Sequence, residues 1–381
     1  PPRHSVSPGA PQRLPAGRAG FARRSRVLLL SRRSFRRLWR RTVTAGAIQE
    51  EPAMASYRLE LAVSGRDLQQ QSALAAHAEA RGMTGVWVSE VNGADAVTQT
   101  AAAIMATKSA RAGTAIIPIQ TRDPLLMAMT AQTLSDLSGG RFVLGLGTST
   151  TVIVEDWHGR PWGKPLAGTR EFVSLVRQLL AGDRVSAEGP FPMKRSSLAK
   201  KSAAPIPIYL AALNDGMLKL AAEVADGVIL NFVSTRQVKH SVDLIRQVRA
   251  AAGLPAPFEV CVFFRATVTD DRQASLPRYQ QEMLTYLMSP VYQKFFEADG
   301  WGDLCRSTVR LWTSGEREAA LAGIPLEFIT ERALVGPAPE LRAQLEGYAE
   351  AGMDTAFALP VPAPGLEYYA GSTAIVDALT A

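Results

Sequence analysis

Short apolar runs alternate with longer amphipathic segments along the chain from residue 54 onward. Apolar runs of strand length occur at residues 57–63, 85–90, 111–118, 141–147, 206–213, 227–232, 258–267 and 354–359. Segments with helical apolar spacing lie between them, as at 67–81, 94–107, 124–137, 170–180 and 217–225. Strands that are apolar throughout and alternate with helices predict a parallel sheet covered on its outside. Eight such units in about 330 residues favour a (β/α)₈ barrel with insertions, an α/β fold, over an open sheet.

A dinucleotide-binding fold is the main alternative, because Gly145 and Gly147 begin a glycine motif. The motif is incomplete, since Thr150 stands where the third glycine belongs and residues 151–163 are predicted to form a loop rather than a helix. The two glycines also belong to the fourth strand unit rather than the first. The sequence therefore does not support a dinucleotide-binding fold at this site.

The basic charge of the chain is concentrated at its N-terminal end. Residues 1–53 contain 12 of the 42 Lys and Arg residues but only 2 of the 35 Asp and Glu residues. We expect this arginine-rich segment to be disordered, and we interpret Met54 as the start of translation, with a targeting or binding tail as the alternative. The domain at residues 54–381 is mildly acidic, which disfavours binding to nucleic acid.

The remaining composition narrows the class of protein. No run of about 18 apolar residues occurs, so no membrane span is predicted. The two distant cysteines, Cys261 and Cys305, indicate free thiols in a reducing compartment, the cytoplasm. The four histidines are scattered without metal-binding spacing, so no metal site is predicted.

Active-site residues of a (β/α)₈ barrel follow the C-terminal ends of its strands. Glu90 is the one carboxylate at the end of an apolar strand, which suits acid–base chemistry or cofactor binding, or equally a structural acceptor of backbone amides. His158 lies in a loop with Trp157 and Trp162 and is either a proton donor near the barrel end or a surface histidine. The same strand-end rule selects Ser64, Asn92, Ile117, Gln120, Gly147, Thr148, Ser149 and Asn231.

Two further segments carry candidate chemistry. Residues 214–216 precede a helix whose free amides attract phosphate, although Asp215 also suits a helix cap. Residues 277–296 carry aromatic and apolar side chains at mixed helical spacing. They are predicted either to form a lid or substrate wall, or to pack against the barrel.

Several blocks resemble, in the same order, the bacterial luciferase-like monooxygenase superfamily. They are VWVSE at 86–90, SGGRFVLGLGTS at 138–149, EDWHGRPW at 155–162, the segment 206–231 and the segment 335–354. Within the superfamily they resemble most the class that depends on coenzyme F420, an 8-hydroxy-5-deazaflavin. The resemblance runs from about residue 57 to the C-terminus.

The resemblance implies a cofactor bound at the C-terminal end of the barrel. Its ring is expected against strand three, where the family has a bulge with a non-prolyl cis peptide, here around Ile116 and Ile117. Its phosphate region is expected near Gly147, Thr148 and Ser149 and near the helix start at Asn214, Gly216 and Met217. The implied reaction is hydride transfer between the cofactor and a small organic substrate, in a homodimer.

Two departures from the family pattern limit the assignment. Sugar-phosphate dehydrogenases of the superfamily carry a His and a Glu where this chain has Val91 and Thr150, so that activity is not expected. Close relatives have Gly-Pro-Lys where this chain has Asn214-Asp215-Gly216, which weakens the case for a phosphate there. Two alternatives stay open: a reduced-FMN-dependent monooxygenase, or a non-catalytic flavin-binding relative.

Overall fold

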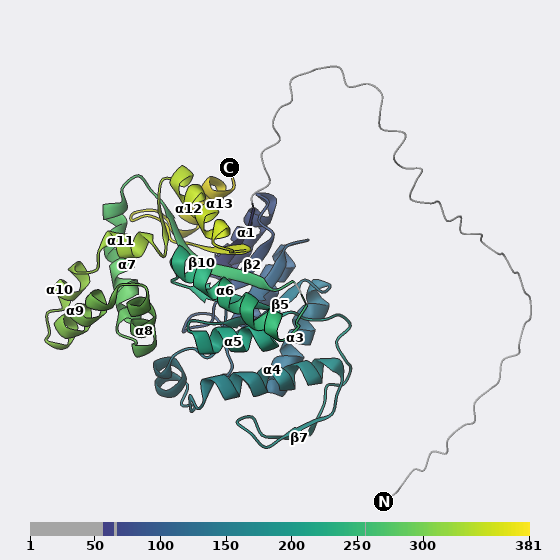
Figure 1. The fold of residues 1–381 in the computed structure, drawn as a ribbon. Helices are drawn as coiled ribbons and strands as arrows, with labels where there is room; N and C mark the ends of the chain where they lie inside the picture. The colour runs from purple at the N-terminus through teal and green to yellow at the C-terminus, as the bar shows by residue number, and fades with distance from the viewer. Residues whose placement is uncertain (1–55, 65–66, 256) are drawn as a thin grey trace, which may run out of the picture. The chain divides into compact units, whose positions relative to one another are not determined.

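The computed structural model describes residues 56–64, 67–255 and 257–381, and Figure 1 shows their arrangement. The predictions made for residues 1–53 concern a segment outside this range. Parallel strands form a closed ring, because β1 pairs with β2 on one side and with β12 on the other. In ring order the strands are β1 (Arg58–Val63), β2 (Gly85–Val88), β3 (Arg111–Thr114) with its continuation β4 (Ile117–Pro118), β5 (Phe142–Gly147), β8 (Ile208–Ala211), β9 (Gly227–Asn231), β10 (Glu259–Val268) and β12 (Thr355–Pro360).

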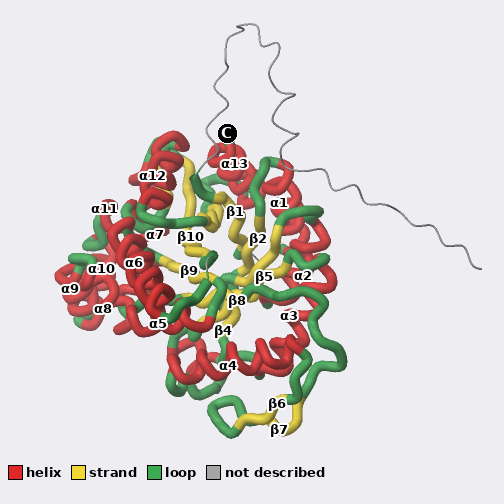
Figure 2. The backbone as a smooth tube through the Cα atoms, turned by 45° about the vertical axis from the view of Figure 1, so that its right-hand side comes forward, coloured by secondary structure: helices red, strands yellow, loops and turns green. Residues whose placement is uncertain are grey.

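Helices surround this ring of strands, as Figure 2 shows with the strands in yellow and the helices in red. They begin where the sequence supplies caps: α3, for example, starts with an Asp123 cap and Pro124, and ends at Gly139 with a φ of 65°. The surrounding helices are α1 (Leu68–Ala80), α2 (Ala96–Ala106), α3 (Pro124–Ser138), α4 (Pro165–Ala181), α5 (Asp215–Val224), α6 (Thr235–Ala251), α12 (Ala338–Glu350) and α13 (Tyr368–Thr380). The predicted (β/α)₈ barrel is therefore confirmed.

The core has two layers, because successive side chains of a strand point to opposite faces. One face packs under the helices and is rich in Leu, Ile and Val. The other face fills the barrel with large aromatic side chains, in which the rings of Trp87 and Phe357 stack with centroids 4.1 Å apart. Cys261 is buried in this interior layer and Cys305 is buried elsewhere, both as free thiols, as predicted.

An ion-pair network lies among the first residues of the strands, at the N-terminal end of the barrel. Arg111 donates to Glu60 at 2.9 Å and to Glu259 at 2.9 Å, and the Thr355 hydroxyl donates to Glu259 at 2.7 Å. Burial alone would raise the pKa of Glu259, but the hydrogen bonds and charge of Arg111 hold that pKa well below its usual range. This end of a (β/α)₈ barrel normally contributes to stability rather than catalysis.

Several segments are added to the barrel. The hairpin β6 (Val185–Ala187) and β7 (Met193–Ser196) follows α4, and β11 (Leu334–Gly336) pairs with β10. Between β10 and β11 lie α7 (Arg272–Leu287), α8 (Pro290–Ala298), α9 (Gly302–Thr313), α10 (Arg317–Ala322) and α11 (Leu326–Thr330). These helices gather on one side of the barrel in both views and share an aromatic cluster of their own (Figures 1 and 2).

One expectation from the sequence needs revision. Residues 151–163 do not form a loop throughout, because Val152–Trp157 is a short π-helix, η1. The segment 277–296 belongs to α7 and α8, which are separated at Met288 and Ser289. None of the helices in the described part of the chain is long and apolar enough to cross a membrane.

Candidate functional site

A bulge in the third strand position lies at the C-terminal end of the barrel. The Ala115–Ile116 peptide bond, which separates β3 from β4, is cis, one bond before the Ile116–Ile117 pair of the prediction. The Ser89 hydroxyl donates to the Ala115 carbonyl at 2.8 Å, and the Glu90 amide donates to the Ile116 carbonyl at 3.3 Å. The end of β2 therefore fixes the backbone of the bulge.

The bulge separates the two isoleucines of the prediction. The Ile116 side chain packs on the aromatic layer inside the barrel and remains partly exposed. The Ile117 side chain is fully buried under the helices instead. Ile116 is thus the side chain that the bulge presents to the interior of the barrel.

Glycines in β5 make room for the bulge. A Cβ at Gly145 would lie 1.7 Å from the Thr114 carbonyl oxygen, and one at Gly147 would lie 2.8 Å from Ile116 Cδ1. Thr114 also bridges to Gly145 through its hydroxyl, which accepts from the glycine amide at 2.9 Å and donates to its carbonyl at 2.7 Å. The glycine pair in this strand therefore serves close packing against β3 and β4.

Glu90 is held by several donors. Arg122 donates to both of its carboxylate oxygens, at 2.6 and 2.9 Å, and the Ala96 amide at the start of α2 donates at 3.0 Å. Both partners of this ion pair are mostly buried, with 14% of the Glu90 side chain and 17% of the Arg122 side chain exposed. This arrangement is that of a structural acceptor, the second of the two roles considered for Glu90.

The loop after β5 has the backbone amides and hydroxyls that were predicted to bind a polar group. Ser149 has a φ of 55°, a left-handed conformation that non-glycine residues seldom adopt and that clusters at functional sites. The Trp162 indole donates to the Thr148 carbonyl at 3.1 Å and so ties the following segment to this loop. His158 lies at the end of η1, exposed to solvent.

The start of α5 differs from a simple phosphate site. The Asn214 side chain accepts from the Met217 amide at 3.1 Å, so this helix cap is already occupied. Asp215 pairs with His240 at 2.8 Å, and a Cβ at Gly216 would lie 3.3 Å from the Leu166 side chain. An anion would meet the charge of Asp215 here, which agrees with the weakness noted from the sequence.

The other predicted residues lie at the expected strand ends. Ser64 follows β1 and Asn92 follows β2, and both are exposed. Gln120, which follows β4, has a buried side-chain carbonyl oxygen with no donor among the described residues. A buried acceptor without a donor is costly, so it is a candidate contact for a bound molecule.

Arg265 in β10 is the residue that the strand-end rule missed. It donates to Asn231 at 2.5 Å and to Glu282 of α7 at 2.6 Å. Its guanidinium lies over the rings of Phe232 and Phe263, 4.0 and 5.1 Å from their centroids. A signal was present, since Arg265 is the one charge inside the otherwise apolar run 260–266.

Aromatic side chains complete this cluster. The Tyr286 ring lies 4.3 Å from that of Phe232 and 4.8 Å from that of Tyr292, measured between centroids. Burial raises the pKa of both tyrosines, although the nearby Arg265 acts against the rise. Both phenols are therefore neutral hydrogen-bonding groups at neutral pH. Phe232, like Ser149, has a left-handed φ, here 55°.

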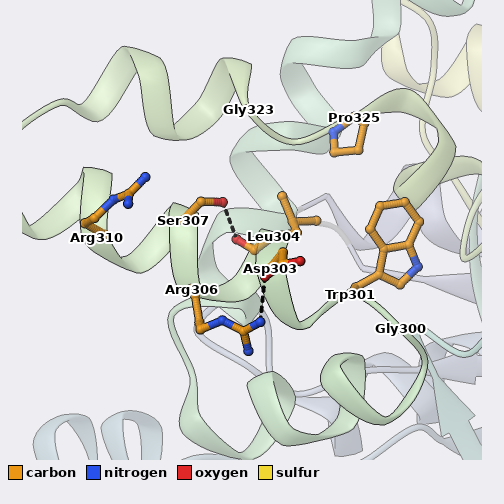
Figure 3. Close-up of a pocket in the computed structure, with 9 residues that line it drawn as sticks. All are labelled: Gly300, Trp301, Asp303, Leu304, Arg306, Ser307, Arg310, Gly323 and Pro325. Carbon is orange, nitrogen blue, oxygen red and sulfur yellow. Dashed lines mark hydrogen bonds and ion pairs between the residues drawn. The ribbon is translucent and has the colours of Figure 1, made fainter.

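Two pockets in the described part of the chain lie apart from the strand-end residues considered above. One, of about 750 Å³, lies among the added helices beside Trp301, where Arg306 pairs with Asp303 at 2.6 Å (Figure 3). The other, of about 720 Å³, opens beside Tyr209 and Glu259 at the N-terminal end. Neither contains the bulge, the Ser149 loop or Arg265, so we place the candidate site on the strand-end residues instead.

Comparisons of the sequence with a family model and with known proteins agree on one family. A family model described as luciferase-like monooxygenase matches residues 47–355. A Mycobacterium tuberculosis protein named as a coenzyme F420-dependent oxidoreductase is 32% identical over 308 residues, which cover 75% of this chain and 89% of that protein.

Solved structures show the same fold at low sequence identity. The coenzyme F420-dependent tetrahydromethanopterin reductase of Methanopyrus kandleri aligns with a TM-score of 0.71 at 20% identity, covering 86% of this chain and 97% of that one. The oxygenating constituent of 3,6-diketocamphane monooxygenase from Pseudomonas putida, in complex with FMN, aligns with a TM-score of 0.59 at 17% identity, covering 85% and 97%.

Proposed function

Since this chain belongs to the luciferase-like monooxygenase family, we propose that it is an oxidoreductase that transfers a hydride between coenzyme F420 and an organic substrate. The identity of the cofactor rests on the relative of 32% identity, whose name includes F420. The observation that supports a flat ring at this site is the bulge, which presents Ile116 to the barrel interior beside Gly147. When bound, a deazaflavin supplies a two-electron hydride donor or acceptor.

The residues around the bulge fit such a group. Ile116 offers an apolar surface to a ring, and Gln120 has an acceptor without a donor nearby. The amides and hydroxyls at Thr148 and Ser149 suit the polar part of the cofactor. The start of α5 fits less well, because Asp215 brings a negative charge there. We therefore assign the anionic part of the cofactor to the loop after β5 in this proposal, with Asn214, Gly216 and Met217 at its margin.

The chain's own residues orient reactants and handle the proton. Hydrogen bonds from Ser89 and Glu90 fix the bulge, so the apolar surface at Ile116 keeps one orientation. His158 is the proposed proton donor, because Glu90 is committed to Arg122 and to the α2 amide. Ser64 and Asn92 are exposed at neighbouring strand ends and complete the proposed contacts.

Equilibrium titration of the full chain with oxidised F420 and, separately, with FMN tests this proposal. Cofactor fluorescence reports binding in both cases. Micromolar binding of F420 with at least tenfold weaker binding of FMN is expected. Gly147→Ala places a methyl group against Ile116 and is expected to weaken F420 binding. Gly93→Ala, whose added Cβ would have no atom within 4 Å, is the matched control and should leave binding unchanged. Binding of neither cofactor would overturn the proposal.

A reduced-FMN-dependent monooxygenase is the second candidate function. The fold shared with an FMN-bound monooxygenase supports it. Preference for FMN in the titration, together with oxygen-dependent consumption of reduced FMN, would establish it in place of the first. A non-catalytic relative would bind a flavin and turn over neither cofactor.

We also propose that the protein works in the cytoplasm as a homodimer. The neighbouring helices α2 and α3 contain a single charged residue, Asp136, over their combined length. Large apolar side chains are exposed on them, with Met105 77%, Met129 50% and Leu137 49% exposed. An apolar face with so few charges is typical of a subunit interface, and a second copy would cover it by two-fold symmetry.

A further inference from the structure

The charged side chains of the barrel strands divide between the two ends. Within the described strands of the ring, Arg58, Glu60, Arg111 and Glu259 lie in the first half of their strands and bond to one another. Arg265 is the only other charged residue of those strands. It lies two residues beyond Phe263, which pairs with the last residue of β9, so it stands at the C-terminal end of the barrel.

Arg265 retains hydrogen-bonding capacity in this position. Its Nε donates to Glu282 and its Nη1 to Asn231, and the Tyr286 phenol lies within hydrogen-bonding range of the guanidinium. Nη2 carries two N–H groups, so at least one of them is left without an acceptor among the described residues. The side chain is 10% exposed, so a bound molecule rather than bulk water is the natural partner of that nitrogen. The guanidinium carbon lies over the rings of both Phe232 and Phe263, which limits the movement of the side chain.

The charges around Arg265 determine which kind of acceptor its remaining N–H group can bind. Glu282 already neutralises Arg265, and Asn231, Tyr286 and Tyr292 around them are uncharged. A second carboxylate or a phosphate would bring an uncompensated negative charge into a largely buried place. A carbonyl or hydroxyl oxygen accepts the hydrogen bond without that cost.

The segments that follow the strands supply apolar surface. Val91 after β2 is 47% exposed, Val152 and Trp157 after β5 are 50% and 53% exposed, and Leu366 after β12 is 58% exposed. Parallel strands bring their C-terminal ends to one end of the barrel, so the segments that carry these side chains leave the barrel at the end where Arg265 lies. An apolar surround with one polar anchor is the usual composition of a site for a small organic molecule.

We propose that Arg265 anchors the substrate through a neutral oxygen, and that the substrate is an otherwise apolar carbonyl or hydroxyl compound. The inference rests on the proposed function, because it assumes that the substrate meets the cofactor at this end of the barrel. Ile116 and Phe263 belong to the same interior layer, on which Arg265 lies, so an anchored oxygen and the bulge share one wall. Arg265 acts here as a positioning residue for the reaction.

Three probes of similar shape test the inference: benzylacetone, hydrocinnamate and butylbenzene, which carry a ketone, a carboxylate and no oxygen. Their dissociation constants are measured by ligand-observed NMR on the full chain, once without cofactor and once with oxidised F420 in excess. We expect Arg265→Met to weaken benzylacetone by about tenfold, the loss of one hydrogen bond from a charged donor, and to change butylbenzene less than twofold. Arg317→Met is the matched control, because Arg317 also lies over an aromatic ring, that of Trp312.

A double variant distinguishes the loss of the hydrogen bond from the loss of stability. Arg265→Met leaves Glu282 without its partner, whereas Arg265→Met with Glu282→Gln removes the orphaned charge and should show the same tenfold loss with a wild-type thermal melting curve. Unchanged benzylacetone binding in the double variant would overturn the inference, as would tighter binding of hydrocinnamate or binding of no probe to the wild type. F420 affinity should change less than threefold in these variants. If wild type binds benzylacetone by this pattern but binds no F420, the proposed function fails and the anchor stands.

Discussion

Replacing Glu90 by Gln separates a structural role of this carboxylate from a catalytic one. In the structure Glu90 accepts two hydrogen bonds from Arg122 and one from the Ala96 amide. A glutamine keeps one side-chain oxygen. In the place of Oε2 it can still accept from Arg122 Nη2 and the Ala96 amide, but the bond from Arg122 Nη1 is lost, because the glutamine NH₂ group then faces that nitrogen. The substitution also leaves Arg122, whose side chain is 17% exposed, without its counter-charge.

The expected loss of stability lies between that of a buried and that of an exposed ion pair. Breaking a buried pair costs about 3–5 kcal/mol, and breaking an exposed pair costs about 0–1 kcal/mol. With 14% and 17% of the two side chains exposed, we expect Glu90→Gln to lower the free energy of unfolding by about 2 kcal/mol. The exposed pair between Arg170 and Glu223, with 53% and 40% exposed, is the control: Glu223→Gln should cost less than about 0.5 kcal/mol.

Urea unfolding of the full chain at neutral pH measures both variants. The midpoint should shift at unchanged slope, because the folded state keeps the surface that unfolding exposes. In a background of Arg122→Met the cost of Glu90→Gln should fall by at least half, since the orphaned charge is gone. Equal costs for Glu90→Gln and Glu223→Gln, together with lost F420 binding in the former, would refute the structural assignment and favour contact with the cofactor.

Three further predictions concern separate parts of the molecule. Gly147→Val should weaken F420 binding at least tenfold by displacing Ile116 from the bulge, as checked by the fluorescence titration, whereas Gly93→Val should not. Met129→Glu should convert the proposed homodimer into a monomer on size-exclusion chromatography with light scattering, since it places a charge in the apolar face of α3. For Glu79, slight burial would raise the pKa, but amide hydrogen bonds outweigh it and lower the pKa to about 2. Its extra stability is therefore present above about pH 4.5 and lost as the pH falls towards 2, and Glu79→Gln should flatten acid unfolding in that window.

The barrel was predictable because its strands are buried on both faces. A strand such as β5 packs under helices on one side and fills the barrel on the other, so its sequence is apolar at nearly every position. The bulge after β3 produces no signal in the apolar pattern of the sequence. Ala115 and Ile116 continue the apolar run of residues 111–118 without interruption, so composition alone cannot show the break. The family resemblance predicted it instead, one bond away from its place in the structure.

The sequence predicts where the residues of the candidate site lie along the strands, but not which side chains they contact. The strand-end rule finds Glu90 and Asn231, because it depends on chain direction alone. It does not show that Arg122 neutralises Glu90 or that Glu282, from an added helix, neutralises Arg265, since those contacts join segments 32 and 17 residues apart along the chain. The π-helix of residues 152–157 was missed because six residues are too few to show a helical apolar period, although Thr150 accepts a hydrogen bond from the Ile153 amide at 3.4 Å, as a helix cap does.

Strand length explains why Arg265 was missed and also why it matters. β10 runs for 10 residues, whereas its neighbour β9 runs for 5 and ends opposite Phe263. Arg265 is therefore still within a strand by sequence, although it has already passed the end of the adjacent strand in space. At the opposite end Arg111 is bonded on both sides by Glu60 and Glu259, and nothing remains for a ligand. Arg265 has one acidic partner from an added helix and a donor to spare. The charge of Arg111 therefore stabilises the barrel, whereas the spare donor of Arg265 is the group that we propose to anchor the substrate.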